Sequence, residues 1–214
     1  MRFADRREAG QMLAKALRGY KGQQPVVLAL PRGGVPVAAE VAKVLEAPLD
    51  LLIVRKIGAP SFPELAMGAV VDGEAPIVVR NEDVIATEGV TEEEFLAVER
   101  RELAEIRRRR ERYLGTRSRA PLADRTVLIV DDGIATGATV RAAVRAVRQA
   151  HPKRIIVAVP VAAADTLVEL RHEADEVVCL EAPEALGAIG YYYDDFAQVS
   201  DEEVIAALAG TGAR

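Results

Sequence analysis

The pattern of apolar positions along the chain predicts an alternation of buried strands and amphipathic helices. Short apolar runs rich in β-branched residues are typical of strands in a parallel sheet that is covered on both faces. Apolar residues at helical spacing follow most of these runs. The predicted strands are 26–30, 49–54, 127–130, 154–160 and 176–180, the predicted helices are 5–17, 36–45, 140–149, 163–172 and 201–208, and a β-hairpin is predicted at 66–71 and 76–79. This order predicts an α/β fold, a Rossmann-like parallel sheet with helices on both faces.

Residues 87–119 interrupt the α/β alternation, and we expect a long helix within them. Thr91 and Glu94 have the spacing of a capping box, which is typical of a helix start. The apolar positions of this segment form a narrow stripe at a spacing close to 3.5 residues: Leu96, Leu103, Ile106 and Tyr113. Such a stripe indicates packing either on the edge of the core or on a second subunit. The second alternative predicts a homodimer.

A length of 214 residues is enough for a full core and most simply gives one domain. We expect a core at about 24–180, a small hood built from about 1–22 and 181–214, and a helical insertion at about 87–119. Half of the residues are apolar, yet no apolar run approaches the length of a membrane span. The chain begins with charged residues and no apolar signal segment, so we expect a cytoplasmic protein without a membrane partner.

Charge and cysteine usage narrow the functional classes. The formal net charge of −5 argues against a general nucleic-acid surface. The run Arg107–Arg110 could bind nucleic acid, but acidic residues lie interleaved with it, so paired surface charge is the favoured interpretation. The single cysteine, Cys179, cannot form an internal disulfide, which agrees with a reducing compartment. It is interpreted as a small buried apolar residue.

Residues 127–139 hold the strongest functional signal. The apolar run 127–130 ends in two consecutive carboxylates, Asp131 and Asp132, and a turn of small residues at 133–139 then leads into a helix. Amide N–H groups at a helix start have no intrahelical partner and lie at the positive end of the helix dipole, so such a turn can bind a phosphate. Carboxylates do not face a phosphate favourably and are better suited to sugar hydroxyls or a divalent cation. Together they indicate a phosphorylated sugar as ligand.

Two further sets of residues follow predicted strands and can bind anions. Arg32, Gly33 and Gly34 stand between a strand and a helix, where glycines permit close approach of the backbone and the arginine can bind two phosphate oxygens. Arg55 and Lys56 follow the next strand, on the side of the sheet where α/β proteins bind ligands. Each signal alone is also compatible with an ordinary turn or a solvated basic pair. In combination with residues 127–139 they predict a second anion site.

Residues 127–139 resemble the ribose-phosphate signature of type I phosphoribosyltransferases, in which an apolar strand, two acidic residues, an apolar residue and a Thr-Gly turn follow one another. The resemblance implies that Asp131 and Asp132 hold the ribose 2′ and 3′ hydroxyls, and that one of them can also accept a proton from the incoming base. It implies that the 5′-phosphate of 5-phosphoribosyl 1-diphosphate is bound by Ile134, Ala135, Thr136, Gly137, Ala138 and Thr139. Ala138 replaces a glycine that is usual in the family.

The same resemblance extends to other parts of the chain. It implies that Arg32, Gly33, Gly34, Arg55 and Lys56 grip the pyrophosphate and that a loop at 57–70 closes over the site. The segment around Gly190 is similar to the Val-Gly-Tyr…Asp part of 6-oxopurine phosphoribosyltransferases. That similarity implies a base pocket at Ile189 and Tyr191, and a magnesium site formed by Asp131, Asp132 and Asp194. The family's stacking aromatic would fall at Gly187, and its base-reading lysine has no counterpart at 160–162.

The sequence therefore predicts a magnesium-dependent pentosyltransferase. The expected reaction transfers the phosphoribosyl group of phosphoribosyl diphosphate to a nitrogen nucleophile, a nucleobase, and releases pyrophosphate. An alternative is a regulatory protein of the same fold that senses phosphoribosyl diphosphate or nucleotides and binds nucleic acid through Arg107–Arg110. A further alternative is an accessory domain that keeps the sugar-phosphate site but has lost base binding.

Overall fold

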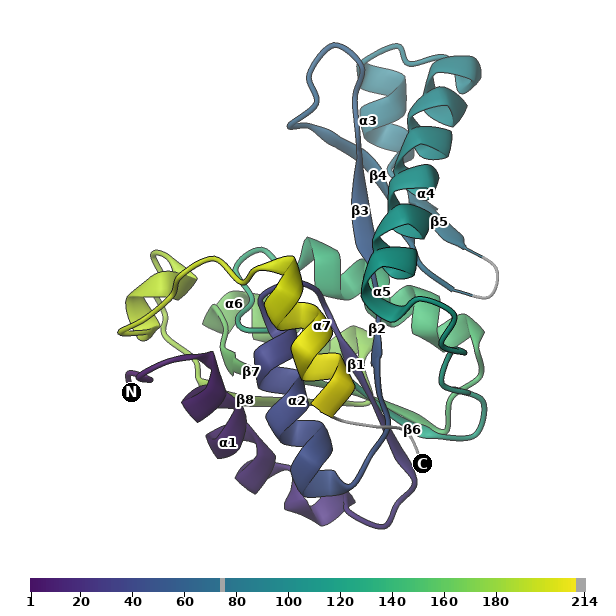
Figure 1. Ribbon diagram of the computed structural model, residues 1–214. Helices are drawn as coiled ribbons and strands as arrows, with labels where there is room; N and C mark the ends of the chain where they lie inside the picture. Colours follow the sequence, from purple (N-terminus) through teal and green to yellow (C-terminus); the bar gives the residue numbers. More distant parts are fainter. Residues whose placement is uncertain (74–75, 211–214) are drawn as a thin grey trace.

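The computed structural model describes residues 1–73 and 76–210 and has a parallel sheet at its centre (Figure 1). The five strands lie in the order β2-β1-β6-β7-β8. Their bounds are Pro25–Ala29 for β1, Leu49–Leu51 for β2, Thr126–Val130 for β6, Arg154–Val161 for β7 and Glu176–Glu181 for β8. Every residue of β1 and β6 is buried, as expected for strands covered on both faces. The predicted α/β fold is confirmed.

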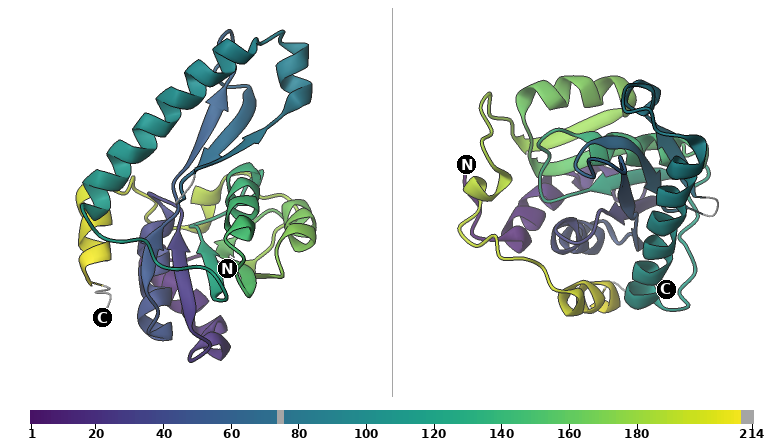
Figure 2. Two further views of the ribbon diagram at one scale, coloured as in Figure 1. Left: turned by 90° about the vertical axis from the view of Figure 1, so that its right-hand side faces the viewer. Right: turned by 90° about the horizontal axis from the view of Figure 1, so that it is seen from above.

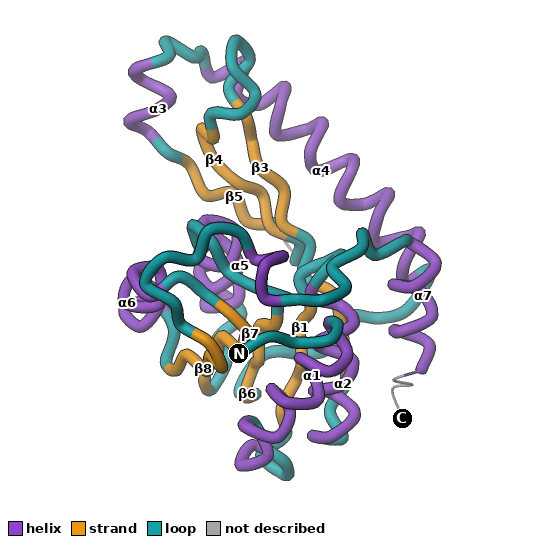
Figure 3. The backbone as a smooth tube through the Cα atoms, turned by 90° about the vertical axis from the view of Figure 1, so that its left-hand side faces the viewer, coloured by secondary structure: helices purple, strands orange, loops and turns teal. Residues whose placement is uncertain are grey.

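Helices cover both faces of this sheet, as Figure 3 shows from the side. Alternate strand residues enter different cores: Val27 and Ala29 of β1 pack with α2, whereas Val26 and Leu28 pack with α5. The helices of the first face are α1 (Arg6–Ala16), α2 (Gly34–Leu45) and α7 (Asp201–Gly210), and those of the second face are α5 (Ala138–Gln149) and α6 (Ala164–Glu173). The predicted helices are therefore present, with small differences at their ends.

The two chain ends, for which the sequence predicts a small hood, pack on the main body and meet near Tyr193, and the hood stays a prediction. Helix α1 begins at Asp5, whose side chain accepts a hydrogen bond from the Glu8 amide, and it packs on α2, β7 and β8 as part of the main body. The last helix, α7, packs on α2 and α4. Phe3 forms a parallel bridge with Tyr193, so the first residues lie beside the irregular segment that contains the 3₁₀ turn η2 (Ile189–Tyr192). The part of the expected hood at 211–214 lies outside the described residues.

A second, antiparallel sheet stands away from the main one. The predicted strand 49–54 is wrong as a single element, because the chain leaves β2 after Leu51 and begins β3 (Val54–Gly58) in the order β3-β4-β5. Strands β4 (Ala66–Val71) and β5 (Ile77–Arg80) are antiparallel, which confirms the hairpin. Figure 2 shows these strands and the following helices projecting from the body. We call residues 54–114 the arm.

The long helix of the arm is α4 (Glu92–Leu114), preceded by the short α3 (Glu82–Thr87). The capping box of Thr91 and Glu94 is present with both hydrogen bonds. The apolar face differs by one position from the predicted stripe, since Phe95 is fully buried and Leu96 is exposed. Helix α4 packs on β3, β4 and α7 of its own chain. Because the stripe has these intramolecular partners, the homodimer stays a prediction.

The arginine run of α4 has acidic partners. Arg108 and Arg109 both pair with Glu105, at 2.8 and 2.6 Å. These contacts hold the pKa of the Glu105 carboxyl at about 2, well below its usual 4.5. Arg110 points inward, where its Nη1 lies 3.0 Å from the buried carboxylate of Asp72. The interpretation of this run as paired charge agrees with these contacts, and the absence of nucleic-acid binding stays a prediction.

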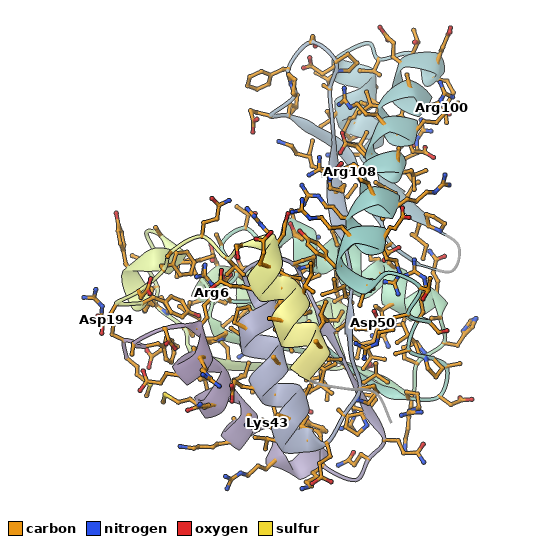
Figure 4. All side chains as sticks on the ribbon, viewed as in Figure 1. Arg6, Lys43, Asp50, Arg100, Arg108 and Asp194 are labelled. Carbon is orange, nitrogen blue, oxygen red and sulfur yellow. The ribbon has the colours of Figure 1, made fainter. Side chains whose placement is uncertain are left out.

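A buried charge network connects the arm to the body. Asp72, at the end of β4, accepts hydrogen bonds from Arg110 and Arg119, and Arg110 also reaches Asp50 of β2 at 3.3 Å. The Ala120 amide donates to Asp50 at 2.9 Å. Asp50, labelled in Figure 4, lies at the base of the arm.

Within the described parts of the chain, no helix is both long and apolar enough to cross a membrane.

Candidate functional site

The strand-to-helix turn after β6 is tied to the end of the neighbouring strand. Ile134 is buried, its amide donates to Val161 O at 2.9 Å, and its carbonyl accepts from the Ala163 amide at 3.1 Å. Thr166 Oγ1 of α6 donates to Ala135 O at 2.7 Å. These bonds hold the turn against the end of β7 and the start of α6. The turn therefore lies at the carboxyl edge of the sheet, where α/β proteins bind ligands.

The outer part of the same turn is open. Ala135, Thr136, Ala138 and Thr139 are exposed, and Gly137 caps α5 with a left-handed φ of 73°. Among the described residues, the amide N–H groups of 135–139 have no hydrogen-bond partner. A row of free amides at the start of a helix is an anion site in both charge and geometry. The structure thus brings together the residues predicted to bind a phosphate.

Gly137→Ala is expected to distort this turn. An alanine at this position would have to keep the positive φ of Gly137, and its Cβ would lie 2.7 Å from Thr166 Cγ2. We expect a loss of about 1–3 kcal/mol in the free energy of unfolding, from strain and crowding together, and weaker binding of inorganic phosphate. The matched control is Gly89→Ala, which has φ +64° but open space around the new methyl group. Urea unfolding of both variants checks this, and equal losses would contradict the crowding at Gly137.

The acidic pair lies against the glycine turn that follows β1. The Asp132 carboxylate occupies the space that a Cβ at Gly33 would need, and a Cβ at Gly34 would lie 3.1 Å from Asp131 Oδ1. The Leu30 amide donates to Val130 O at 3.0 Å, which joins the ends of β1 and β6, and the Pro31–Arg32 peptide bond is cis. The predicted ribose residues and the predicted pyrophosphate turn are therefore direct neighbours. Burial, together with the nearby Asp132 carboxylate, raises the pKa of Asp131.

Two residues that the sequence analysis missed contact Asp132. Arg6 of α1 places its Nε 2.7 Å from Asp132 Oδ2, and the buried Tyr193 hydroxyl donates to Asp132 O at 2.6 Å. Both come from regions distant in sequence, one at each end of the chain. A weak signal for Tyr193 was available, because aromatic residues are scarce in this chain and gather at 191–196. Nothing in the local pattern around Arg6 indicated a site.

The predicted basic residues divide between two places. Arg32, on the glycine turn, keeps 31% of its side-chain surface exposed and has one distant acidic partner, Asp201 Oδ1 at 3.8 Å. Arg55 pairs with the buried Glu102 of α4 at 2.7 Å, and Lys56 pairs with Glu64 at 3.1 Å. Arg32 directly precedes the glycines that contact the acidic pair, whereas the partners of Arg55 and Lys56 belong to the arm.

The structure does not bring the predicted metal and base residues together as one group. Asp194 is exposed, pairs with Arg2 at 2.6 Å, and lies at the outer edge of the molecule in Figure 4. No three His, Cys, Asp or Glu side chains in the described part of the chain form a group that could hold a metal ion. Ile189 packs on Gly133, since a Cβ added at Gly133 would lie 2.5 Å from the Cγ2 atom of Ile189. Tyr191, in contrast, is 74% exposed. The three-aspartate magnesium site stays a prediction, with Asp194 directed to Arg2, and the base pocket at Ile189 and Tyr191 stays a prediction as well.

A cleft of about 510 Å³ separates the arm from the turn at 133–139. Its body side includes Thr136, Ala138 and Arg141, and its arm side includes Gly68 and Arg80. The open amides of the turn therefore border a space enclosed on two sides. This space is of the size that small-molecule sites have.

These features define an α/β protein with a turn of free amides and an acidic pair at the carboxyl edge of its sheet. Comparison with known proteins gives this class a family: the model of the phosphoribosyl transferase domain matches residues 5–195. The chain belongs to the phosphoribosyl transferase domain family.

Relatives agree with this assignment. Proteins from two strains of Mycobacterium tuberculosis, each named "Putative phosphoribosyl transferase", are 48% identical over 206 residues, which is 96% of this chain. The chain spans about half the length of these curated relatives, since the match covers 46% of each. The crystal structure of TT1426 from Thermus thermophilus is 44% identical, covers 100% of both chains and has a TM-score of 0.84. The AQ2163 protein from Aquifex aeolicus, 13% identical over 83% of this chain and 74% of that one with a TM-score of 0.50, shares the fold alone.

Proposed function

We propose that the chain is a phosphoribosyltransferase that uses 5-phosphoribosyl 1-diphosphate and Mg²⁺ to ribosylate a nitrogen nucleophile. One observation carries this proposal: the acidic pair lies against the turn of Gly33 and Gly34 and leads directly into the turn with the open amides of 135–139. A phosphorylated ribose with a diphosphate on its anomeric carbon needs an anion site at each end and hydroxyl acceptors between them. Family membership supports the transferase class.

The residues have distinct tasks in the proposed reaction. The bond from the anomeric carbon to pyrophosphate breaks with its electron pair leaving on pyrophosphate, the acceptor nitrogen forms the new bond, and the nitrogen loses a proton. Positive charge develops on the ribose, so the site must hold the sugar firmly and neutralise the leaving group. The turn 135–139 holds the 5′-phosphate, Asp131 accepts the ribose hydroxyls, and Arg32 neutralises the pyrophosphate. Asp131 is also placed to accept the proton.

The expected Mg²⁺ is compatible with the residues present. Mg²⁺ keeps several waters and is usually bound by one or two carboxylates together with substrate phosphates, so it does not require three protein ligands. Asp132 is already paired with Arg6, whereas Asp131 has no cationic partner among the described residues. Asp131 and the substrate's diphosphate would hold the ion, which supplies charge neutralisation to the leaving group.

The proposed acceptor is a nucleobase, but the site differs from a stacking pocket. Ile189 contacts Gly133, the residue that follows the acidic pair. Gly187 has no side chain to stack on a base, and the Tyr191 ring lies against it, 3.1 Å from where a Cβ would be. The cleft between the arm and the turn has room for a small acceptor. The arm would form the second wall of this acceptor space.

Pyrophosphate release tests the proposal. Phosphoribosyl diphosphate and Mg²⁺ are incubated with the chain and with free purines and pyrimidines, each added singly, and pyrophosphate is measured. Release that depends on one base confirms transfer and identifies the acceptor. Calorimetric binding of phosphoribosyl diphosphate without release from any base points to the sensing protein or accessory domain instead. No binding at all would overturn the assignment of residues 131–139.

A further inference from the structure

Arg6 connects the first turn of α1 to the acidic pair. Its Nε lies 2.7 Å from Asp132 Oδ2, and the two side chains keep only 11% and 13% of their surface exposed. An ion pair this sheltered is weakly screened by salt, and either charge would be costly to leave alone. The Arg6–Asp132 pair therefore holds a side chain of the site in place. It differs in this from the Arg7–Glu40 pair of α1, in which Arg7 is 71% exposed.

The guanidinium of Arg6 is held from other sides as well. Its Nη1 donates to Ala197 O at 2.8 Å, and its centre lies 3.9 Å from the centroid of the Phe196 ring. Phe196 stacks on Tyr193 at 4.9 Å, and the Tyr193 hydroxyl donates to Asp132 O at 2.6 Å. The segment 193–197 thus fixes the head of Arg6 and the backbone of Asp132 at the same time.

These contacts make the two carboxylates unequal. Asp132 is compensated by Arg6 and stands against Gly33, where it occupies the space of a Cβ. Asp131 accepts a hydrogen bond from the Asp132 amide at 2.9 Å and has no cationic partner within the described residues. Asp131 is therefore the carboxylate without an ion pair, and Asp132 determines the position of its neighbours.

We propose that Arg6 is a positioning residue of the sugar-phosphate site. By holding the Asp132 carboxylate against the Gly33 turn, it keeps that turn and Asp131 in the arrangement that binds phosphoribosyl diphosphate. The inference rests on the proposed function, because it concerns the same substrate. Arg6 acts through Asp132 and does not itself contact the substrate.

The test compares Arg6→Gln with a matched variant one residue away. Arg7→Gln changes the next arginine of α1, whose Nε lies 3.0 Å from Glu40 Oε1 with 71% of the side chain exposed. The dissociation constant of phosphoribosyl diphosphate with Mg²⁺ is measured by calorimetry. Arg6→Gln is expected to weaken binding by roughly 10- to 100-fold, as loss of a partner behind a ligating group does in metal sites. Arg7→Gln is expected to bind like the wild-type chain.

A double-mutant cycle separates positioning from general damage to the fold. If Arg6 acts through Asp132, adding Arg6→Gln to Asp132→Asn produces no further loss of affinity, and additive losses would overturn the inference. Arg6→Lys, which keeps the charge, serves if the Gln variant does not fold and is expected to have an affinity between wild type and Gln. Wild-type affinity in folded Arg6→Gln overturns this inference alone. No binding by the wild-type chain overturns the proposed function, and this inference with it.

Discussion

Asp131→Asn is expected to lose transfer activity while keeping or increasing stability. The carboxylate lies beside the glycine turn without an ion pair among the described residues, and removing its charge removes the proposed acceptor for the ribose hydroxyls and for the nitrogen's proton. We expect kcat/KM to fall by roughly 10²- to 10³-fold or more, the range for loss of one preorganised electrostatic contact to a transition state. The measurement is steady-state pyrophosphate release with the acceptor that the base panel identifies.

The stability of the same variant follows from the pKa of Asp131. Burial and the neighbouring Asp132 raise that pKa in the folded protein, so the folded state binds a proton more tightly than the unfolded chain does. Ionisation of Asp131 therefore costs stability, and this loss grows as the pH rises from the unfolded pKa to the folded pKa and is absent below the unfolded pKa. Asparagine carries no charge at any pH, so Asp131→Asn should be at least as stable as wild type at pH 7.

The control for Asp131→Asn lies at the opposite end of the same strand. Asp124 precedes β6, is exposed, and has φ +58°, a conformation that asparagine accepts well. Asp124→Asn should leave both activity and the free energy of unfolding unchanged. An Asp131→Asn variant with wild-type turnover would contradict the role of this carboxylate. A variant that loses activity only because it unfolds would contradict the expected stability.

Local patterns were enough to predict most of the body and part of the site. The run 127–139 combines a buried strand, two acids and a small-residue turn, and each of these follows from a few consecutive residues. The structure brings the two acids beside Gly33 and Gly34, because neighbouring parallel strands end at one edge of the sheet. The proximity of these two turns therefore follows from the sheet order, in which β1 and β6 are neighbours.

The parts that were missed depend on contacts between distant segments. Residues 49–58 form one apolar and basic run, and nothing within it shows that the chain changes sheets after Leu51. A continuous strand at 49–54 would put Arg55 and Lys56 on the ligand side of the main sheet, whereas β3 carries them into the arm. Arg6 acquires its role only when α1 packs beside the segment 193–197. Asp194 follows a family pattern, yet the chain directs it outward to Arg2.

Asp72→Ala is expected to cause the largest loss of stability. Asp72 is 4% exposed and accepts hydrogen bonds from Arg110 and Arg119, so the substitution removes a buried acceptor that both guanidinium groups share. Breaking a buried ion pair by removing one partner costs about 3–5 kcal/mol. The same network reaches Asp50 of β2, which connects the arm to the main sheet. The free energy of unfolding, measured by urea denaturation, should fall by this amount.

Glu64→Ala is the matched control for the buried network. It also removes an acid that pairs with a cation of the arm, but Glu64 is 82% exposed where it meets Lys56, so the expected loss is below about 1 kcal/mol. Both variants remove an acid that pairs with a cation. The difference between their losses in the free energy of unfolding therefore measures the effect of burying the ion pair. Asp72→Ala should also speed amide hydrogen exchange in β2 and β4, because the network joins these strands through Asp50 and Asp72. Equal losses in both variants, with unchanged exchange, would show that the arm is held to the body by apolar packing alone.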